Sequence, residues 1–211
     1  MPHIRALIIF FLIPKIGLSQ FVLSKFNPDT LGKKSIISGQ PIYTIKWKDK
    51  LGDNFIILTE GKEVNVDPMK APATMNDDDV HKNKSLYAFH LVNGDSVLWK
   101  LTDFEKLCPF DVIAEFRDGS TRITDIDKNG IAETWIMYST TCASDVSPRT
   151  LKLILHQGSN KYAIRGTSQP STSMEDKEYG GKFVPDHSFQ TLPKSFLKYA
   201  QELWSQYLYD Y

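Results

Sequence analysis

The chain has 211 residues, 25 basic and 25 acidic side chains, and a formal net charge of zero at pH 7. Nucleic acids and anionic membranes are bound chiefly by an excess of Lys and Arg, so this balance argues against both kinds of partner. The length suits one domain with its own core, and the four Trp, nine Tyr and twelve Phe are typical of half-buried strands.

Residues 1–19 predict an export signal. His3 and Arg5 precede an apolar run over residues 6–13, and two small residues then frame a cleavage site before Gln20. The run is shorter than the about 20 apolar residues of a spanning helix, so we expect no transmembrane anchor in the mature chain. A buried N-terminal strand is the alternative interpretation. We expect an exported protein in the periplasm, on the outer surface or outside the cell.

Cleavage would leave one secreted β-rich domain, residues 20–211. The signal contains Arg5 and Lys15, so 23 of the 25 basic residues remain against 25 acidic ones, a net charge of −2. The two cysteines, Cys108 and Cys142, are predicted to form a disulfide because export places them in an oxidising compartment. The alternative is a nucleophilic Cys108, for which the sequence places no histidine nearby.

The mature chain predicts a series of short antiparallel strands. The clearest hairpin joins residues 85–92 to residues 96–102 through Asn93-Gly94, the strongest short-range signal for such a turn. The predicted strands, in chain order, are 40–47, 54–59, 85–92, 96–102, 111–116, 121–124, 134–139, 151–156 and 161–165.

Two long surface loops and one helix complete the predicted fold. Residues 61–84 and 167–182 contain Pro, Gly, Ser and acidic residues that break the strand pattern. The apolar period then changes to about 3.6, which predicts one amphipathic helix over 193–209. We therefore expect a mainly β fold, an antiparallel meander or sandwich-like sheet with this helix packed on it; an α+β arrangement would also fit.

The segment 125–133, DIDKNGIAE, predicts a calcium-binding turn between two strands. Calcium prefers six to eight oxygen ligands, and side chains at alternate positions of a short loop converge. Gly130 permits the sharp turn that most residues oppose. We expect structural calcium, bound with a dissociation constant of about 10⁻⁴ to 10⁻³ M, as in extracellular modules. The predicted ligands are the side chains of Asp125, Asp127, Asn129 and Glu133 and the carbonyl of Ile131.

The same loop has a metal-free interpretation, because Asn129-Gly130 also suits a hairpin turn. Crowded carboxylates repel each other without a cation, which favours the metal. The twelfth position is Ile136 rather than the bidentate glutamate of an EF-hand, and the predicted flanks are strands rather than helices. The acidic run 77–79 is a weaker second candidate, because consecutive acids point in different directions.

No catalytic residue is identified by the sequence. Asp111, Glu115 and Asp118 could be imagined as paired acids for glycoside hydrolysis, but surface charge is the default interpretation of such residues. Trp99 and Trp135 could stack on sugars, although most strand tryptophans are core residues. The histidines lack the spacing of a zinc site and are scattered, at positions 81, 90, 156 and 187.

Two resemblances add to this interpretation. The D-x-D-x-[DN]-G core of residues 125–133 resembles the calcium loops of integrin-type FG-GAP repeats, which implies a metal and not a fold. Segments 98–116, 124–148, 161–167 and 179–189 resemble a family of exported Bacteroidetes proteins labelled surface polysaccharide biosynthesis proteins. That label implies a role connected with lipopolysaccharide or another surface glycan, and it names no reaction.

Two functional hypotheses result. The first is a non-catalytic, calcium-stabilised envelope or secreted protein that binds surface polysaccharide or assists its biosynthesis. The second is an envelope enzyme that acts on glycan through loop carboxylates. The absence of a catalytic motif favours the first hypothesis, and a surface glycan is the expected partner in both.

Overall fold

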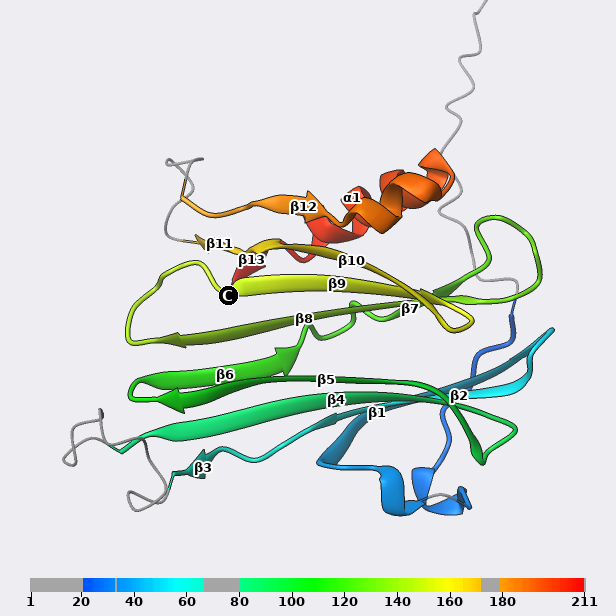
Figure 1. The fold of residues 1–211 in the computed structure, drawn as a ribbon, viewed down its shortest axis with the longest axis horizontal. Helices are drawn as coiled ribbons and strands as arrows, with labels where there is room; N and C mark the ends of the chain where they lie inside the picture. The colour runs from blue at the N-terminus through cyan, green and yellow to red at the C-terminus, as the bar shows by residue number, and fades with distance from the viewer. Residues whose placement is uncertain (1–20, 33, 67–79, 172–178, 211) are drawn as a thin grey trace, which may run out of the picture.

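The described part of the chain forms two stacked antiparallel sheets, a short two-stranded parallel sheet and one C-terminal α-helix in the structure, which is a computed structural model (Figure 1). The predicted mainly β fold, with a sandwich of sheets and one helix, is confirmed. The predicted signal 1–19 and the acidic run 77–79 lie outside the described residues. The residues described are 21–32, 34–66, 80–171 and 179–210.

Sheet A contains the strands of the first half of the chain. The Asn93-Gly94 turn between β4 and β5 is confirmed, and both residues have the positive φ values that such a turn requires, 53° and 82°. The strand β5 continues past its predicted end at residue 102. The order is β1 (Gln40–Asp49), β2 (Gly52–Glu60), β4 (Lys82–Val92) and β5 (Ser96–Cys108), with β3 (Val64–Asn65) pairing beside β2 on the start of β4.

Sheet B follows in the chain and has β8 at its centre. Residues 133–140 of β8 are all buried, because this strand is covered on both faces. Two short strands share one of its edges: β7 pairs with the start of β8 and β6 with its end. The order is β12 (Phe183–Pro185), β10 (Asn160–Thr167), β9 (Thr150–Gln157), β8 (Glu133–Ala143), then β6 (Asp111–Phe116) and β7 (Arg122–Thr124).

Alternation of side chains along β8 divides the core of the protein in two. Ile136 and Tyr138 face sheet A and belong to the core between the sheets. Trp135 and Met137 face the opposite way and belong to the core beneath the helix. The protein is therefore layered as sheet A, sheet B and helix, as Figure 1 shows from the side.

The helix α1 (Lys194–Gln206) covers the outer face of sheet B. Its buried stripe consists of Phe196, Ala200, Leu203 and Trp204. The prediction that the helix extends to residue 209 is wrong, because β13 (Tyr209–Asp210) pairs in parallel with β11 (Gln169–Pro170). Asp210 accepts hydrogen bonds from Arg117 and Ser168, and these contacts draw the end of the chain away from the helix axis.

The segment before β1 covers part of the outer face of sheet A. It contains two short 3-10 helices, η1 (Pro28–Thr30) and η2 (Lys34–Ile36). Leu31, which lies between them, packs against Ile57, Phe89 and Leu91. The 3-10 helix η5 (His187–Thr191) leads into α1 on the opposite side of the molecule.

Four aromatic rings from both sheets contact one another in the core between the sheets. His90 lies 5.3 Å from Trp47 and 5.3 Å from Trp99, centroid to centroid, and His156 stacks on Trp99 at 4.1 Å. His90 Nε2 lies 2.9 Å from Asn54 Oδ1. Neither ring nitrogen of His156 has a hydrogen-bond partner within the described part of the chain. Both imidazoles therefore lie in a site that disfavours charge.

Asp103 is an inward-facing charge on β5, the edge strand of sheet A. Its carboxylate accepts hydrogen bonds from Tyr138 Oη at 2.8 Å and Lys152 Nζ at 2.5 Å, both on sheet B. Burial alone would raise the pKa of Asp103, but these hydrogen bonds outweigh it and the pKa lies below its usual value. An inward charge of this kind is one way in which natural proteins protect an edge strand from pairing with other chains.

Replacing Gly166 with alanine should weaken the attachment of β12 to β10. A Cβ at Gly166 would lie 1.7 Å from the carbonyl oxygen of Lys182 and 3.1 Å from the ring of Trp204. Overpacking of this kind costs about 1 to 3 kcal/mol, which urea denaturation would measure. Gly32→Ala is the control, because a Cβ at Gly32 would have no neighbour within 4 Å. Equal stability of the two variants would contradict the prediction.

Candidate metal centre

The loop between β7 and β8 contains the predicted metal ligands. Thr124 and Glu133 are paired across the two strands, and the residues between them form the loop. Gly130 adopts the positive φ that the sequence predicts, 81°. Lys128 also has a positive φ, 57°, although it is not a glycine. The strand, loop, strand arrangement is therefore confirmed, and it differs from the two helices of an EF-hand.

Three carboxylates of this loop converge. One oxygen of each of Asp125, Asp127 and Glu133 can be chosen so that all three lie within 4.8 Å of one another. Asp125 is partly buried, Asp127 is exposed and Glu133 is fully buried. This acidic group could hold a metal ion, because hard cations such as calcium prefer clustered carboxylate oxygens.

Glu133 forms the buried floor of the group. Its carboxylate accepts hydrogen bonds from Thr124 Oγ1 at 2.6 Å and from the Ile126 amide at 2.9 and 3.0 Å. Burial raises the pKa of Glu133 above its usual value, and the nearby charge of Asp127 adds to the increase, while the hydrogen bonds that the carboxylate accepts oppose it. Without a cation, the site therefore penalises the charge of Glu133.

Backbone amides of the loop hold the other two carboxylates. Asp125 accepts from the Gly130 amide at 3.1 Å, and Asp127 accepts from the Asn129 amide at 3.1 Å. Gln157 on β9 donates from Nε2 to Asp127 at 2.9 Å, which attaches the loop to sheet B. Hydrogen bonds from the protein itself therefore position both carboxylates.

The side chain of Asn129, a predicted ligand, also stabilises the turn through two hydrogen bonds. Its Oδ1 atom accepts from the Ile131 amide at 2.7 Å, and its Nδ2 atom donates to Asp127 at 3.0 Å. Ligation by Asn129 Oδ1 and by the carbonyl of Ile131 stays a prediction.

Asp49 at the end of β1 and Lys50 in the turn that follows it also hold the loop, although no local sequence pattern indicates this. Asp49 accepts from the Ala132 amide at 3.0 Å, and the Lys50 amide donates to the Gly130 carbonyl at 3.0 Å. The ammonium of Lys50 donates to the Asn129 carbonyl. Because Asp49 and Lys50 belong to sheet A, these contacts join the two sheets at the loop. The two segments are about 80 residues apart in the chain, so no local pattern could predict the contact.

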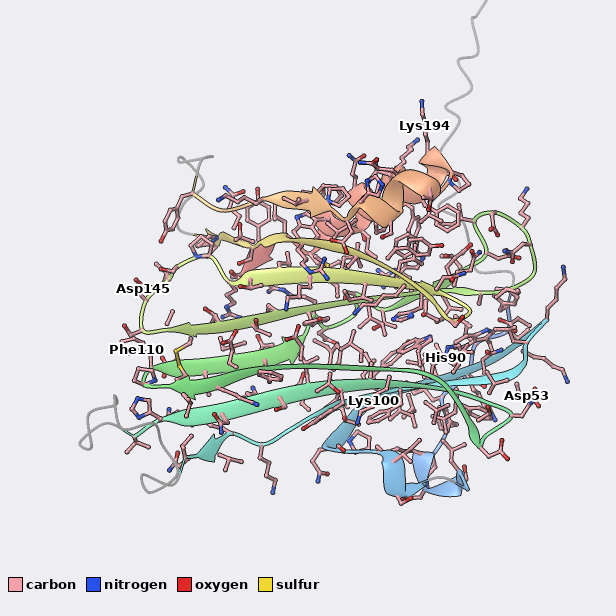
Figure 2. The ribbon with its side chains drawn as sticks, viewed as in Figure 1. Asp53, His90, Lys100, Phe110, Asp145 and Lys194 are labelled. Carbon is pink, nitrogen blue, oxygen red and sulfur yellow. A yellow bond between two sulfur atoms is a disulfide. The ribbon has the colours of Figure 1, made fainter. Side chains whose placement is uncertain are left out.

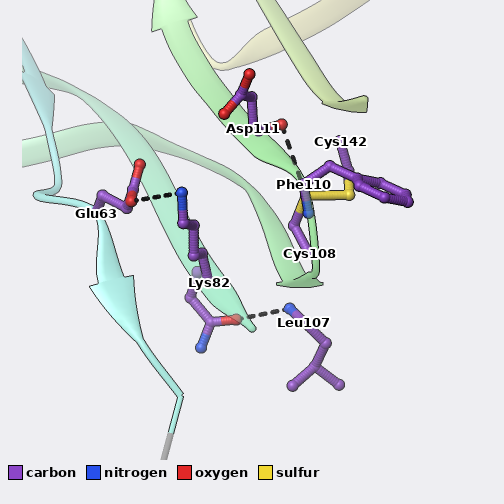
Figure 3. Close-up of a disulfide and its surroundings, with 8 residues drawn as sticks. Glu63, Lys82, Leu107, Cys108, Phe110, Asp111 and Cys142 are labelled. Carbon is purple, nitrogen blue, oxygen red and sulfur yellow. Dashed lines mark hydrogen bonds and ion pairs between the residues drawn. A yellow bond between two sulfur atoms is a disulfide. The ribbon is translucent and has the colours of Figure 1, made fainter. Parts of the chain in front are cut away.

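The disulfide joins the same two sheets at the opposite end of β8. Cys108 ends β5 in sheet A and Cys142 lies near the end of β8 in sheet B, with 5.5 Å between their Cα atoms (Figure 3). The predicted disulfide is confirmed, and the alternative of a free nucleophilic Cys108 is wrong. The loop and the disulfide are separated by most of β8, about 30 Å at 3.3 Å per residue.

The other residues considered for chemistry do not form one site. Glu115 pairs with Arg149 at 2.8 Å, whereas Asp111 and Asp118 are exposed. The Trp99 and Trp135 side chains are 8% and 0% exposed, so both are core residues and neither presents a face for sugar stacking. The structure instead brings His90 and His156 together around Trp99, a contact that their separation in the chain did not predict.

The described residues contain no helix long and apolar enough to cross a membrane. Comparison of the chain with protein-family models, with curated proteins and with solved structures finds no match.

Proposed function

We propose that the loop 125–133 binds one calcium ion with a structural role, in a non-catalytic exported protein that associates with surface polysaccharide. The convergence of the Asp125, Asp127 and Glu133 carboxylates is the observation that carries the calcium proposal. Calcium would offset the negative charge of this acidic group, and it would reduce the repulsion between Asp127 and Glu133.

The position of the loop supports a structural role. Its backbone is hydrogen-bonded to Asp49 and Lys50 of sheet A, and Gln157 connects it to sheet B. An ion that fixes this loop therefore also fixes the contact between the sheets. Its contribution adds to that of the disulfide, which joins the sheets at the other end.

The polysaccharide association rests on the resemblance of four segments to exported surface polysaccharide biosynthesis proteins. The alternative of an envelope enzyme requires carboxylates that can reach a substrate. Glu133 is fully buried and Glu115 is paired with Arg149, so neither acid favours the enzyme. Retention of the mature protein on a column of the organism's own surface polysaccharide would test the association, and elution in the void volume would contradict it.

Calcium should raise the thermal stability of the mature protein. At 10 mM calcium, a dissociation constant of about 10⁻⁴ to 10⁻³ M gives about 1.4 to 2.7 kcal/mol of stabilisation, which corresponds to roughly 3 to 10 °C in melting temperature. Asp127→Ala should abolish this shift because it removes an exposed carboxylate of the acidic group. The measurement is differential scanning calorimetry in calcium and in chelator.

Asp118→Ala is the matched control for this experiment. Asp118 is an exposed carboxylate in the turn after β6, outside the acidic group, so this variant should keep the full calcium shift. Identical melting curves of the wild type in calcium and in chelator would contradict the calcium proposal. Loss of the shift in Asp118→Ala would show that the effect does not come from this loop.

A further inference from the structure

A strip of outward-facing side chains follows β4 and β5 on the outer face of sheet A. Direct partners across β4 and β5 point to the same face of the sheet. Phe89 lies in the outer core beneath the N-terminal segment, so its partner Lys100 also faces outward. The same alternation turns Leu86 and Leu101 inward. We name this set the outer strip; it consists of Ser85, Tyr87, Lys100, Thr102, Phe104 and Lys106.

The outer strip combines exposed aromatic surface with positive charge. Phe104 is 45% exposed, and Lys106 Nζ lies 4.3 Å from its ring centroid. Lys100 Nζ lies 5.6 Å from the Tyr87 ring centroid and 5.3 Å from that of Phe89. Neither lysine has an ion-pair partner among the described residues. Phe89 is fully buried, whereas Phe104 and Tyr87 are partly exposed, so each lysine lies beside one ring that a ligand can reach.

The acidic residues of β5 face the other way. In the strand register, Asp103 lies opposite Leu86 and Glu105 lies opposite Lys84, both on the inner face of the sheet. Asp103 also accepts hydrogen bonds from Lys152 and Tyr138 of sheet B. The outer strip thus carries positive charge on a mature chain whose predicted net charge is −2. This local separation of charge is complementary to an anionic partner.

The chemistry of the strip fits an acidic polysaccharide. A sugar ring has an apolar face that packs on an aromatic ring, as apolar groups do on Phe and Tyr generally. Its carboxylates pair with ammonium groups, and its hydroxyls hydrogen-bond to Ser85 and Thr102. From Lys100 to Lys106 the strip extends about 20 Å at 3.3 Å per residue, enough for several sugar units in a row.

We infer that the outer strip binds an acidic polysaccharide chain, with Phe104 packed on a sugar ring and Lys100 and Lys106 paired with its carboxylates. This inference rests on the proposed association with surface polysaccharide and adds the location of the site and the charge of the glycan. It does not depend on the calcium loop. That loop precedes the start of β8, whereas the outer strip runs toward Cys108, which is bonded to Cys142 near the end of β8.

Affinity electrophoresis and titration calorimetry with defined polymers would test the inference. The polymers are polygalacturonate, a polymer of acidic sugars; dextran, a neutral one; and polyglutamate, an acidic polymer without sugar rings. The wild type should bind polygalacturonate, with affinity that falls as salt rises, and should bind the other two at least tenfold more weakly. Phe104→Ala and the double variant Lys100→Gln with Lys106→Gln should each lose about tenfold in affinity for polygalacturonate.

Two control variants match these changes. Tyr179→Ala removes a ring that is 42% exposed and whose hydroxyl donates to Ser147, between β8 and β9 of sheet B. Lys194→Gln removes an exposed lysine at the start of α1, on the opposite side of the molecule from sheet A (Figure 2). Both controls should bind like the wild type, and melting curves would establish that every variant is folded.

Three results would overturn the inference: no binding of polygalacturonate, equal binding of polyglutamate, or wild-type affinity in the folded strip variants. Retention of those variants on the organism's own polysaccharide would overturn the outer strip as the site and leave the proposed association intact. Elution of the wild type in the void volume of that polysaccharide column would instead contradict the proposed association itself.

Discussion

Replacing both Cys108 and Cys142 with alanine should lower the free energy of unfolding by about 4 kcal/mol. The disulfide closes a loop with a sequence separation of 34, and cross-linking a loop of that length removes this much chain entropy from the unfolded state at 25 °C. It also joins sheet A to sheet B, which are otherwise held together by packing and by hydrogen bonds such as those of Asp49 and Asp103. Urea denaturation at pH 7 would measure the change.

Chemical reduction provides the control for this prediction. A reductant should destabilise the wild type by a similar amount and leave the double variant unchanged. A double variant within about 1 kcal/mol of the oxidised wild type would contradict the prediction. That outcome would mean that the contacts of the loop 125–133 and the core between the sheets hold the sandwich by themselves.

Lowering the pH from 7 to 4 should destabilise the protein by several kcal/mol through His90 and His156. Burial lowers the pKa of His90 to about 4, with Asp49 opposing the shift. Burial also lowers the pKa of His156 to about 3, and the charges of Lys161 and His90 add to this effect. The unfolded chain titrates near 6.5, so between these values it binds protons that the folded chain does not.

The contribution of the two neutral histidines to the free energy of unfolding should therefore be fully present above about pH 6.5. It should decrease as the pH falls toward the pKa values of the folded chain. Each pKa unit corresponds to about 1.4 kcal/mol, so each histidine contributes on the order of 3 kcal/mol between pH 7 and pH 4. The raised pKa of Glu133 works in the opposite direction. A carboxyl that binds a proton more readily in the folded chain than in the unfolded chain stabilises the folded state as the pH falls.

The variant His156→Gln isolates this effect, because glutamine does not titrate. Its stability at pH 7 will differ from that of the wild type, but the slope of stability against pH between 6.5 and 4 should be clearly smaller. His187→Gln, which changes an exposed histidine in η5, should keep the wild-type slope. Parallel slopes for His156→Gln and the wild type, measured by denaturation at four pH values, would refute the assignment.

Local patterns predicted most of the fold. The Asn93-Gly94 turn and the alternating strands around it gave the correct hairpin, since turn chemistry and side-chain alternation are encoded by neighbouring residues. The end of β5 was missed because Asp103 is polar and faces inward, where its partners come from sheet B. The end of the helix was missed for a similar reason, because Asp210 is held by distant Arg117.

The candidate metal centre was predictable only in part. The spacing of Asp125, Asp127 and Glu133 is local, and the structure brings their carboxylates together as expected. The contribution of Asp49 depends on how sheet A stacks on sheet B, which no local spacing encodes. The burial of Glu133 likewise depends on β8 being covered on both faces.

The central strand β8 has a consequence for how the protein opens. Because the disulfide secures one of its ends and the loop contacts to Asp49 and Lys50 secure the other, the two sheets cannot slide past each other without breaking one of these attachments. Fluctuations should therefore start at the weaker, non-covalent end. In amide hydrogen exchange, we expect protection to decrease along β8 from Cys142 toward Glu133. The two sheets would then separate first at the loop and stay joined at the disulfide.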